Sequence, residues 1–246
     1  MNEIKKNENL QLNSITLYRE NLCLFKDFSL NFEKNKITVI LAPSGAGKTT
    51  LLDFIAGLLE AKSGNMSNIS FVSYMFQDHR LLPWLNLQKN VLIPLLGIMS
   101  KSEAKKRALD FLKKVGLNSK VLDFPDKCSG GEKQRCALAR AFAFPSNILL
   151  MDEAFRSQDL QVRLSLMDLT ETLLEEENRT VIFVTHDVRE AICIADRIVV
   201  LKGRPLQIKL DIHNIKKDNN MFLRYTNPCL ENLEIDKMIL TELCKK

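Results

Sequence analysis

Residues 36–56 read KITVILAPSGAGKTTLLDFIA and decide how this chain folds. Residues 36–41 are rich in β-branched and apolar side chains, which is typical of a short buried strand. A turn rich in proline and glycine follows, and the apolar spacing of residues 48–56 then suits a buried helix. A strand that runs through a glycine-rich loop into a helix is the setting in which proteins bind phosphate groups.

The loop predicts a nucleoside triphosphate site. Backbone N–H groups around Gly45 and Gly47 can surround a phosphate, and the following helix presents its positive N-terminal end. Lys48 adds a charge between the β and γ phosphates, and the Thr49 hydroxyl suits a magnesium ligand. The predicted nucleotide-binding residues of the loop are Ala42, Pro43, Ser44, Gly45, Ala46, Gly47, Lys48, Thr49 and Thr50.

The loop departs from the G-x-x-x-x-G-K-T pattern at its first position, where this chain has Ala42. A β-carbon there costs about 1 kcal/mol if the backbone needs a positive φ, and little if it does not. Since Gly45 and Gly47 are intact, we expect ATP binding to survive the substitution.

Other segments extend the fold beyond the loop. Residues 148–151 and 180–185 are nearly all apolar, as in strands covered on both faces, so a mainly parallel α/β sheet is expected. Apolar residues between Leu160 and Leu174 recur at helical spacing and predict a crossover helix. From about Asn86 to Phe144 only helix signals occur, which indicates an all-helical insertion. A short strand is expected at 206–210.

Polar side chains follow the two predicted strands. Asp152 and Glu153 end the first of them beside the phosphate loop, so Asp152 can hold magnesium through water and Glu153 can polarise an attacking water. His186 follows the second strand and precedes a helix. The sequence therefore places His186 at the same sheet edge as Asp152.

A second anion site is predicted at Ser129-Gly130-Gly131-Glu132, which precede a helix expected from about Glu132 to Phe144. Together with the phosphate loop, Gln77, the acidic pair and Thr185-His186-Asp187, this tetrapeptide resembles the signature of the ATP-binding cassette (ABC) ATPases. The resemblance runs from about Ile15 to Leu201.

The resemblance implies a P-loop NTPase fold, with a RecA-like mainly parallel sheet, an antiparallel β subdomain and an inserted all-helical subdomain. One ABC ATPase domain would cover residues 1–246. Its nucleotide-binding core would comprise 1–85 and 145–210, the helical signature subdomain 86–144 and a C-terminal tail 211–246. An amphipathic stretch in the tail, 233–243, could pack on the core or on a partner.

The resemblance also assigns roles, with ATP and Mg²⁺ as the cofactors. Glu153 would be the catalytic base and His186 the switch histidine that contacts the γ-phosphate, beside Lys48. The metal ligands would be Thr49, Gln77 and Asp152. Tyr18 is the candidate for stacking on adenine, with Phe25 as the alternative, and either could be core.

Two copies would be needed, because one chain has one γ-phosphate but two phosphate-binding helix ends. The resemblance implies a homodimer, or a pair of ATPase subunits, in which each signature completes the partner's site. The signature residues in trans would be Ser129, Gly130, Gly131 and Glu132, and Asp159 would be the D-loop aspartate at the interface.

The chain departs from the family at several positions. Cys128 stands where leucine is usual, and Glu132 where glutamine is common; a glutamate is unfavourable near a triphosphate unless it turns toward Lys133 or Arg135. Between Glu153 and Asp159, the usual proline, glycine, alanine and leucine are replaced by Ala154, Arg156, Ser157 and Gln158. We expect an active enzyme, and these departures are compatible with slow turnover.

Residues 78–87, DHRLLPWLNL, follow Gln77 and contain the only tryptophan, Trp84. Such a patch could be core. The sequence of this segment resembles that of ATPase subunits of importers for nitrate, sulfonate, taurine and thiamine precursors. The resemblance implies that membrane permease subunits dock near Gln77 to Leu87. An extracytoplasmic solute-binding protein would take part indirectly.

Composition limits the alternatives. The net charge is +5, and the basic residues form no continuous block, which argues against binding to nucleic acid. The longest apolar stretch, 91–99, is about half a membrane span, so the chain is not expected to cross a bilayer by itself. The six cysteines form no metal-like spacing, and buried reduced thiols favour the cytoplasm. The resemblance to importer ATPases implies a peripheral protein at the cytoplasmic face of the cell membrane. The rival hypotheses are a soluble ABC ATPase in assembly or nucleic-acid maintenance, and an ATP sensor that does not hydrolyse.

Overall fold

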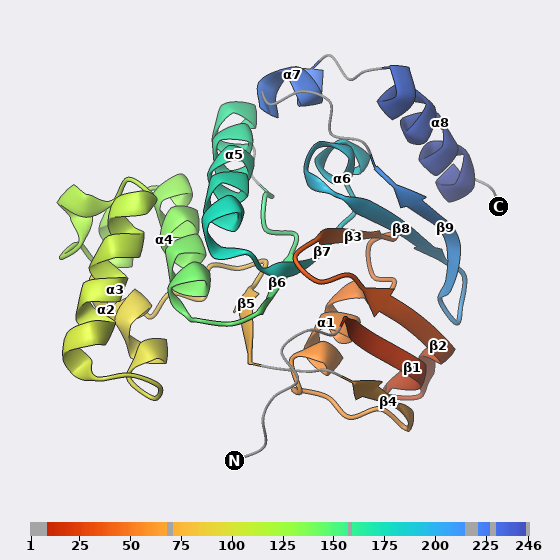
Figure 1. Cartoon of the computed structure of the whole chain (residues 1–246), viewed down its shortest axis with the longest axis horizontal. Helices are drawn as coiled ribbons and strands as arrows, with labels where there is room; N and C mark the ends of the chain where they lie inside the picture. The colour runs from red at the N-terminus through yellow and green to blue at the C-terminus, as the bar shows by residue number, and fades with distance from the viewer. Residues whose placement is uncertain (1–8, 68–70, 157–158, 215–220, 227–229, 245–246) are drawn as a thin grey trace.

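The computed structural model describes residues 9–67, 71–156, 159–214, 221–226 and 230–244, which fold around two sheets (Figure 1). The strands are β1 (Leu10–Arg19), β2 (Leu22–Phe32), β3 (Ile37–Leu41), β4 (Ser63–Ser67), β5 (Val72–Met75), β6 (Ile148–Asp152), β7 (Thr180–Thr185), β8 (Arg197–Lys202) and β9 (Gln207–His213). The helices are α1 (Lys48–Ile55), α2 (Leu87–Leu92), α3 (Lys101–Lys114), α4 (Gly130–Ala143), α5 (Leu160–Glu177), α6 (Val188–Ile194), α7 (Met221–Thr226) and α8 (Leu230–Cys244).

Among the described residues, the larger sheet has the order β5-β6-β7-β3-β8-β9. Its strands are parallel except β9, which pairs antiparallel with β8. The smaller sheet, β2-β1-β4, is antiparallel. The mainly parallel sheet predicted from residues 36–41, 148–151 and 180–185 is confirmed, and so is the antiparallel sheet that the resemblance implied.

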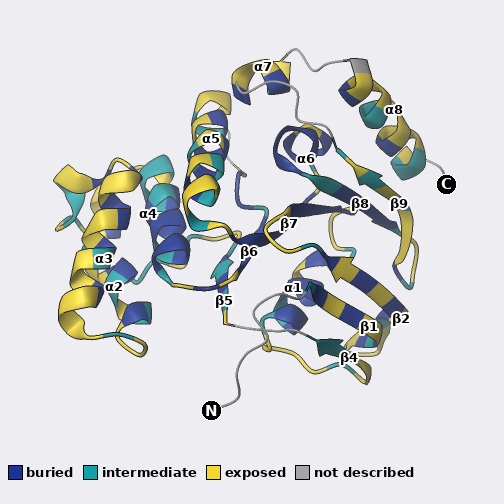
Figure 2. Ribbon diagram, in the orientation of Figure 1, coloured by how far each residue is buried: buried dark blue, intermediate teal, exposed yellow. Residues whose placement is uncertain are grey.

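The central strands are apolar throughout because both of their faces are covered. All five residues of β3 are buried, and its side chains alternate between two cores. Ile40 belongs to the core shared with α1 and the antiparallel sheet, whereas Val39 and Leu41 belong to the core on the opposite face. Figure 2 shows these strands in dark blue, while the antiparallel sheet alternates buried and exposed positions.

The strand register brings three loops to one edge of the parallel sheet. Leu41 at the end of β3 pairs with Thr185 at the end of β7, and Asp152 at the end of β6 pairs with Val184. Parallel strands present their carboxyl ends at the same edge, where α/β proteins bind ligands. The phosphate loop, Glu153 and His186 therefore leave the sheet side by side.

The helices α2, α3 and α4 pack against one another at one end of the molecule (Figure 1). Helix α4 begins at Gly130, two residues before the predicted start at Glu132. The reason is local: Ser129 caps the helix, and Glu132 forms a capping box with it. Both signature glycines therefore lie in the first turn of α4.

Other predicted boundaries also shift. The strand expected at 206–210 is β9, which runs from Gln207 to His213 because it follows β8 along its whole length. Helix α5 extends to Glu177 and ends where Asn178 takes a left-handed conformation with φ of 46°. Upstream of β5, Ile69 and Ser70 lie outside the described residues.

The amphipathic stretch 233–243 forms part of α8 and packs on its own chain. Ile239 is fully buried, and α8 lies against α6 and β9. The Lys202 ammonium donates to the carbonyl of Glu242 at 2.8 Å. This settles the choice left open by the sequence in favour of the core.

The described cysteines are free thiols, namely Cys23, Cys128, Cys136, Cys193 and Cys244, while Cys229 lies outside the described residues. Within the described part of the chain, every helix falls short of the length and apolarity that a membrane span requires.

Candidate functional site

The phosphate loop requires glycine at two positions. Gly45 has φ of 73° and Gly47 has φ of 110°, both in the left-handed region that side chains disfavour. Gly47 is also the N-cap of α1, and a β-carbon on it would lie 3.0 Å from the Leu24 Cδ1 atom. The loop therefore turns sharply into the helix and leaves its backbone accessible to a phosphate.

The ammonium of Lys48 lies inside this loop. Its Nζ donates to the carbonyls of Ala42 at 2.8 Å and Pro43 at 3.1 Å, and lies 3.9 Å from Glu153 Oε1. Burial lowers the pKa of Lys48, while the charges of Glu153 and Asp152 partly offset that effect. A buried cation among carbonyl and carboxylate oxygens fits a loop that binds a phosphate oxygen.

Ala42 takes the place of a glycine without backbone strain. It is absent from the described residues with positive φ, and its side chain is 2% exposed in the core. The condition under which Ala42 would cost about 1 kcal/mol is therefore not met.

We accordingly expect Ala42→Gly to change ATP affinity by less than about twofold, because the backbone conformation suits alanine as well as glycine. Isothermal titration with ATP measures this directly. An affinity gain above tenfold would show that the alanine weakens the loop.

A hydroxyl and a carboxylate lie together at the predicted magnesium position. Thr49 Oγ1 donates to Asp152 Oδ2 at 2.7 Å. Burial raises the pKa of Asp152, which is 4% exposed, and the Thr49 hydrogen bond acts in the opposite direction. Magnesium commonly takes one or two protein oxygens plus substrate phosphates, so this pair fits the ion. The described residues contain no cluster of three or more acidic, histidine or cysteine ligands.

Glu153 is the centre of the polar contacts at this edge. Its Oε1 lies 3.1 Å from His186 Nδ1, and its Oε2 lies 3.4 Å from both Gln77 Nε2 and Arg156 Nη1. The backbone has a left-handed φ of 43°, and the Glu153 N–H donates to the Val184 carbonyl at 2.9 Å. A non-glycine residue in that region costs about 1–3 kcal/mol and persists where neighbours hold it.

These side chains line a cleft of about 570 Å³. Its lining residues are Gln77, Asp78, His79, Glu153, Arg156, Arg163, Thr185, His186, Asp187 and Glu190. The structure thus brings together Lys48, Thr49, Gln77, Asp152, Glu153 and His186, which come from four separate segments.

The signature carboxylate, Glu132, pairs with a lysine that lies outside the signature. Glu132 Oε2 accepts the Ser129 N–H at 2.9 Å, and Glu132 Oε1 pairs with Lys120 Nζ at 2.8 Å. Glu132 does turn toward a cation, but that cation is Lys120 and not Lys133 or Arg135. The capping box directs the side chain back over the helix start, and the turn before α4 supplies the cation; these bonds lower the pKa of Glu132.

The signature does not reach the phosphate loop of its own chain. Figure 1 places α4 among the helices and α1 on the far side of β6, beside the antiparallel sheet. Asp159 caps α5, accepting from the N–H groups of Gln161 at 2.8 Å and Val162 at 3.1 Å. Ser157 and Gln158, two of the altered positions, lie outside the described residues.

The two candidates for the adenine stacker differ in exposure. Tyr18 is 41% exposed, with the Lys62 ammonium 5.0 Å from its ring centre. Phe25 is fully buried and packs edge to face on Phe28, with ring centres 5.0 Å apart. Phe25 is therefore a core residue, and Tyr18 remains the predicted stacker.

The Trp84 segment lies on the surface. Trp84 is 69% exposed, so the interpretation of this residue as core is wrong. The loop is held by Asn90, a buried amide that sequence reasoning missed. Its Oδ1 accepts the Leu82 N–H at 2.7 Å, and its Nδ2 donates to the carbonyls of Leu82 at 3.1 Å and Leu85 at 3.0 Å. The available signal was an asparagine at helical spacing from Leu87 and next to Val91, on the face of α2 that is buried.

Arg140 is a second residue that sequence reasoning did not identify. It connects the signature helix α4 to the residues after Gln77 by hydrogen bonds. Its guanidinium donates to the carbonyls of His79 at 2.6 Å and Arg80 at 2.7 Å. Burial lowers the pKa of Arg140. A rigid link therefore joins α4 to the segment that carries Trp84.

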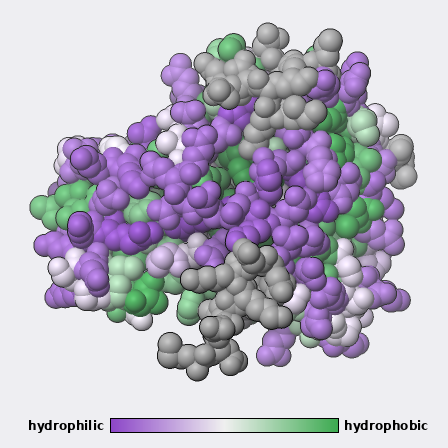
Figure 3. All heavy atoms as spheres, viewed as in Figure 1, coloured by the Kyte–Doolittle hydropathy of each residue, from purple (hydrophilic) through white to green (hydrophobic). Residues whose placement is uncertain are grey.

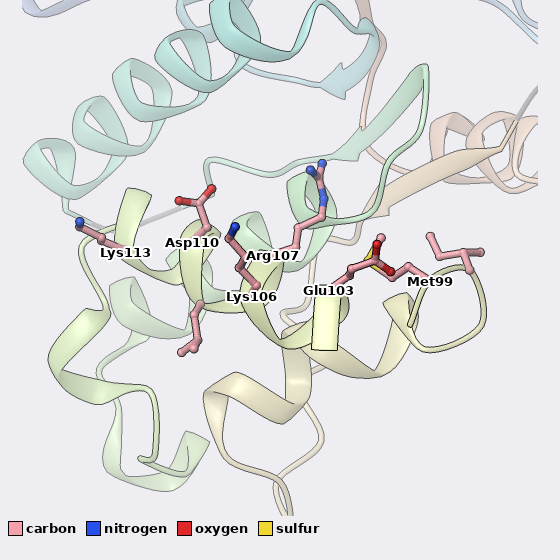
Figure 4. A pocket seen from close by; sticks show the side chains of 8 residues that line it. Met99, Glu103, Lys106, Arg107, Asp110 and Lys113 are labelled. Atoms are coloured by element: carbon pink, nitrogen blue, oxygen red, sulfur yellow. The ribbon is translucent and has the colours of Figure 1, made fainter. Parts of the chain in front are cut away.

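A second hollow of about 770 Å³ lies on the helical part, along α3 (Figure 4). Figure 4 shows Lys106, Asp110 and Lys113 along the helix, with Glu103 and Met99 near its start. Glu103 is engaged in the capping box of α3, and Arg107 donates to the Ala143 carbonyl at 2.5 Å. None of the predicted site residues lines this hollow.

Known proteins resemble this chain in sequence. The family described as "ABC transporter" matches residues 25–156. The aliphatic sulfonates import ATP-binding protein SsuB 1 of Rhodococcus jostii is 40% identical over 201 residues, which cover 79% of each chain. SsuB of Delftia acidovorans is 38% identical over 215 residues, covering 85% of this chain and 88% of the relative.

One solved structure with a similar fold is a dimer. The dimeric post-hydrolysis state of the ATP-binding cassette MJ0796, bound to ADP and phosphate, superposes with a TM-score of 0.72 at 30% identity. The match covers 83% of this chain and 98% of that one.

Proposed function

This chain belongs to the ABC transporter family and is an ATP-hydrolysing cassette, and from that premise we propose that it powers an importer of small organic anions of the sulfonate type. The observation that carries the proposal is the convergence of Lys48, Glu153 and His186 at one sheet edge, beside a surface loop suited to a membrane partner. The sulfonate-import relatives support the choice of solute class.

The phosphate loop would bind ATP by exchanging partners. Lys48 would release the carbonyls of Ala42 and Pro43 and donate to β and γ phosphate oxygens instead. Thr49 and Asp152, with Gln77, would hold Mg²⁺, which when bound neutralises charge on the phosphates. Tyr18 would stack on the adenine ring.

Glu153 would act as the general base. With Lys48 and His186 engaged by the γ-phosphate, the Glu153 carboxylate is free to accept a proton from the attacking water. His186 would donate to a γ-phosphate oxygen and stabilise the charge that develops there. The contacts of Glu153 with Gln77 at 3.4 Å and with His186 at 3.1 Å support this assignment.

Two chains would complete each site. Ser129, Gly130 and Gly131 present the positive end of α4, and a second copy would bring that end to the γ-phosphate bound by the first. Asp159 would lie at the contact between the copies. The dimeric state of the MJ0796 cassette supports this arrangement. Because Lys120 neutralises Glu132, its carboxylate would not oppose closure.

The membrane partner would dock on the segment from Gln77 to Leu87. This segment exposes Trp84, is held in shape by Asn90 and is tied to α4 by Arg140. Closure of the dimer would therefore move the docked permease subunits, and a solute-binding protein would deliver cargo outside the cell. This places the chain at the cytoplasmic face of the membrane.

We expect Trp84→Glu to abolish stimulation of ATPase activity by the permease while leaving the basal rate within about twofold. The exposed indole is a suitable anchor for a partner, and such anchors contribute about 2–4 kcal/mol. The measurement is ATPase activity with the co-expressed permease in lipid nanodiscs. Phe71→Glu is the matched control, because Phe71 is equally exposed at 69% but precedes β5 at the opposite sheet edge.

The function itself is tested by co-purification and uptake. A tagged chain expressed in its native host should be recovered in detergent with a multi-span membrane protein, and cells should accumulate a labelled alkanesulfonate in a manner that depends on Lys48. Failure to recover any multi-span membrane protein with an active ATPase would favour the soluble assembly enzyme. Binding of ATP without turnover, even with the permease present, would favour the sensor.

A further inference from the structure

Arg163 connects three parts of the chain beside the candidate site. It lies in the first turn of α5, and its backbone N–H donates to the carbonyl of Asp159 at 3.1 Å. Its guanidinium donates to Asp187 Oδ2 at 3.0 Å and to the hydroxyl of Tyr225 at 3.4 Å. The helices α5, α6 and α7 therefore meet at one side chain, which also lines the cleft of Glu153.

The residues on both sides of His186 are held by this network. Before it, the Thr185 hydroxyl donates to Glu190 Oε2 at 2.7 Å. After it, Asp187 caps α6 by accepting from the N–H groups of Arg189 at 2.9 Å and Glu190 at 3.2 Å. Asp187 also pairs with Arg163, so the loop that carries His186 is fixed at each flank while the imidazole stays half exposed.

The charge of Arg163 helps to stabilise the ionised carboxylate of Glu190. Its carboxylate is 5% exposed, and Arg163 Nη1 lies 3.8 Å from its Oε1. Burial raises the pKa of Glu190 to about 7. A buried carboxylate needs a cation or a proton, so removal of Arg163 would disturb both the charge of Glu190 and its hydrogen bond to Thr185.

Helix α7 covers this network. Within α7, Arg224 donates to the Cys193 carbonyl of α6 at 2.5 Å and pairs with Glu171 of α5. The Arg189 guanidinium donates to the carbonyl of Tyr225 at 3.1 Å. Helix α7 is thereby fixed across α5 and α6, which places the Tyr225 hydroxyl against Arg163.

We infer that Arg163 is a positioning residue that couples Asp159 at the proposed dimer contact to His186, and that α7 holds it in place through Tyr225. The inference rests on the proposed function, since it assigns a role within that same site. Asp159 and Arg163 lie on one helical turn, and Arg163 donates a hydrogen bond to Asp187, the residue after His186. A shift of Asp159 on dimer closure would therefore reach the imidazole.

Arg163→Gln tests this in the full chain. We expect kcat for ATP hydrolysis to fall roughly 10- to 100-fold with KM within about twofold, because the histidine acts in the transition state and not in nucleotide binding. Arg163→Lys should restore roughly a third of the wild-type kcat, since a lysine can pair with Asp187. Tyr225→Phe should lower kcat by about two- to threefold.

Arg197→Gln is the matched control, because Arg197 also pairs with an aspartate, Asp211, but does so between β8 and β9 and does not line the cleft of Glu153; its kcat should stay within twofold. Thermal melting monitors folding of each variant. Wild-type kcat in Arg163→Gln, or equal losses in kcat and affinity for ATP, would overturn the inference. If Arg163→Gln does not fold, unchanged kcat in both Arg163→Lys and Tyr225→Phe overturns it. An inactive wild-type chain would instead count against the proposed function.

Discussion

Replacing Glu153 with glutamine is expected to slow ATP hydrolysis by roughly 10³-fold, because general-base catalysis contributes about 10²- to 10⁴-fold. Glutamine has the shape of glutamate, so its amide can keep the contacts with His186 and Gln77, which lie 3.1 Å and 3.4 Å from the carboxylate. What it loses is the ability to accept a proton. The affinity for ATP should stay within about twofold of wild type.

Single-turnover hydrolysis and nucleotide titration measure the two quantities separately. Glu175→Gln is the matched control, because Glu175 is an exposed carboxylate near the end of α5, far from the cleft. A Glu153→Gln variant that hydrolyses ATP at half the wild-type rate would remove Glu153 from the role of base.

Lys48→Ala is expected to weaken ATP binding by roughly 10²-fold and to abolish turnover. The ammonium is 5% exposed, so its bonds to phosphate oxygens would form away from water. Removing one partner of a buried hydrogen-bonded charge pair costs about 2–5 kcal/mol. The loss also leaves Asp152 and Glu153 without the nearby cation that the structure provides.

Titration of the purified variant with ATP and magnesium gives the affinity, and Lys105→Ala, an exposed lysine on α3, serves as the control. Turnover that persists in Lys48→Ala would place hydrolysis elsewhere in the chain. Steady wild-type turnover lost in this variant would rule out the sensor hypothesis.

Local features of the fold and the site could be predicted because they depend on adjacent residues. The phosphate loop is one continuous segment, so Gly45, Gly47 and Lys48 could be placed from their spacing alone. The positions of Asp152 and His186 followed from a general property, since parallel strands end at the same edge. The structure confirms that these residues meet.

Contacts between distant segments could not be predicted in the same way. Lys120 pairs with Glu132 through the path of the turn before α4, which no spacing rule specifies. Asn90 acts on a loop whose shape is set by tertiary packing, and Arg163 meets Tyr225 across 62 positions. The exposure of Trp84 and the burial of Phe25 likewise depend on which elements cover them.

The central claim is that each chain supplies half of two ATP sites, so that ATP joins two copies. The most direct test is the molar mass of Glu153→Gln by light scattering after size-exclusion chromatography, with and without saturating ATP and magnesium, alone and together with the permease. The account predicts a shift from one chain to two, with one ATP bound per chain. A variant that binds ATP and remains a single chain under all of these conditions would contradict it.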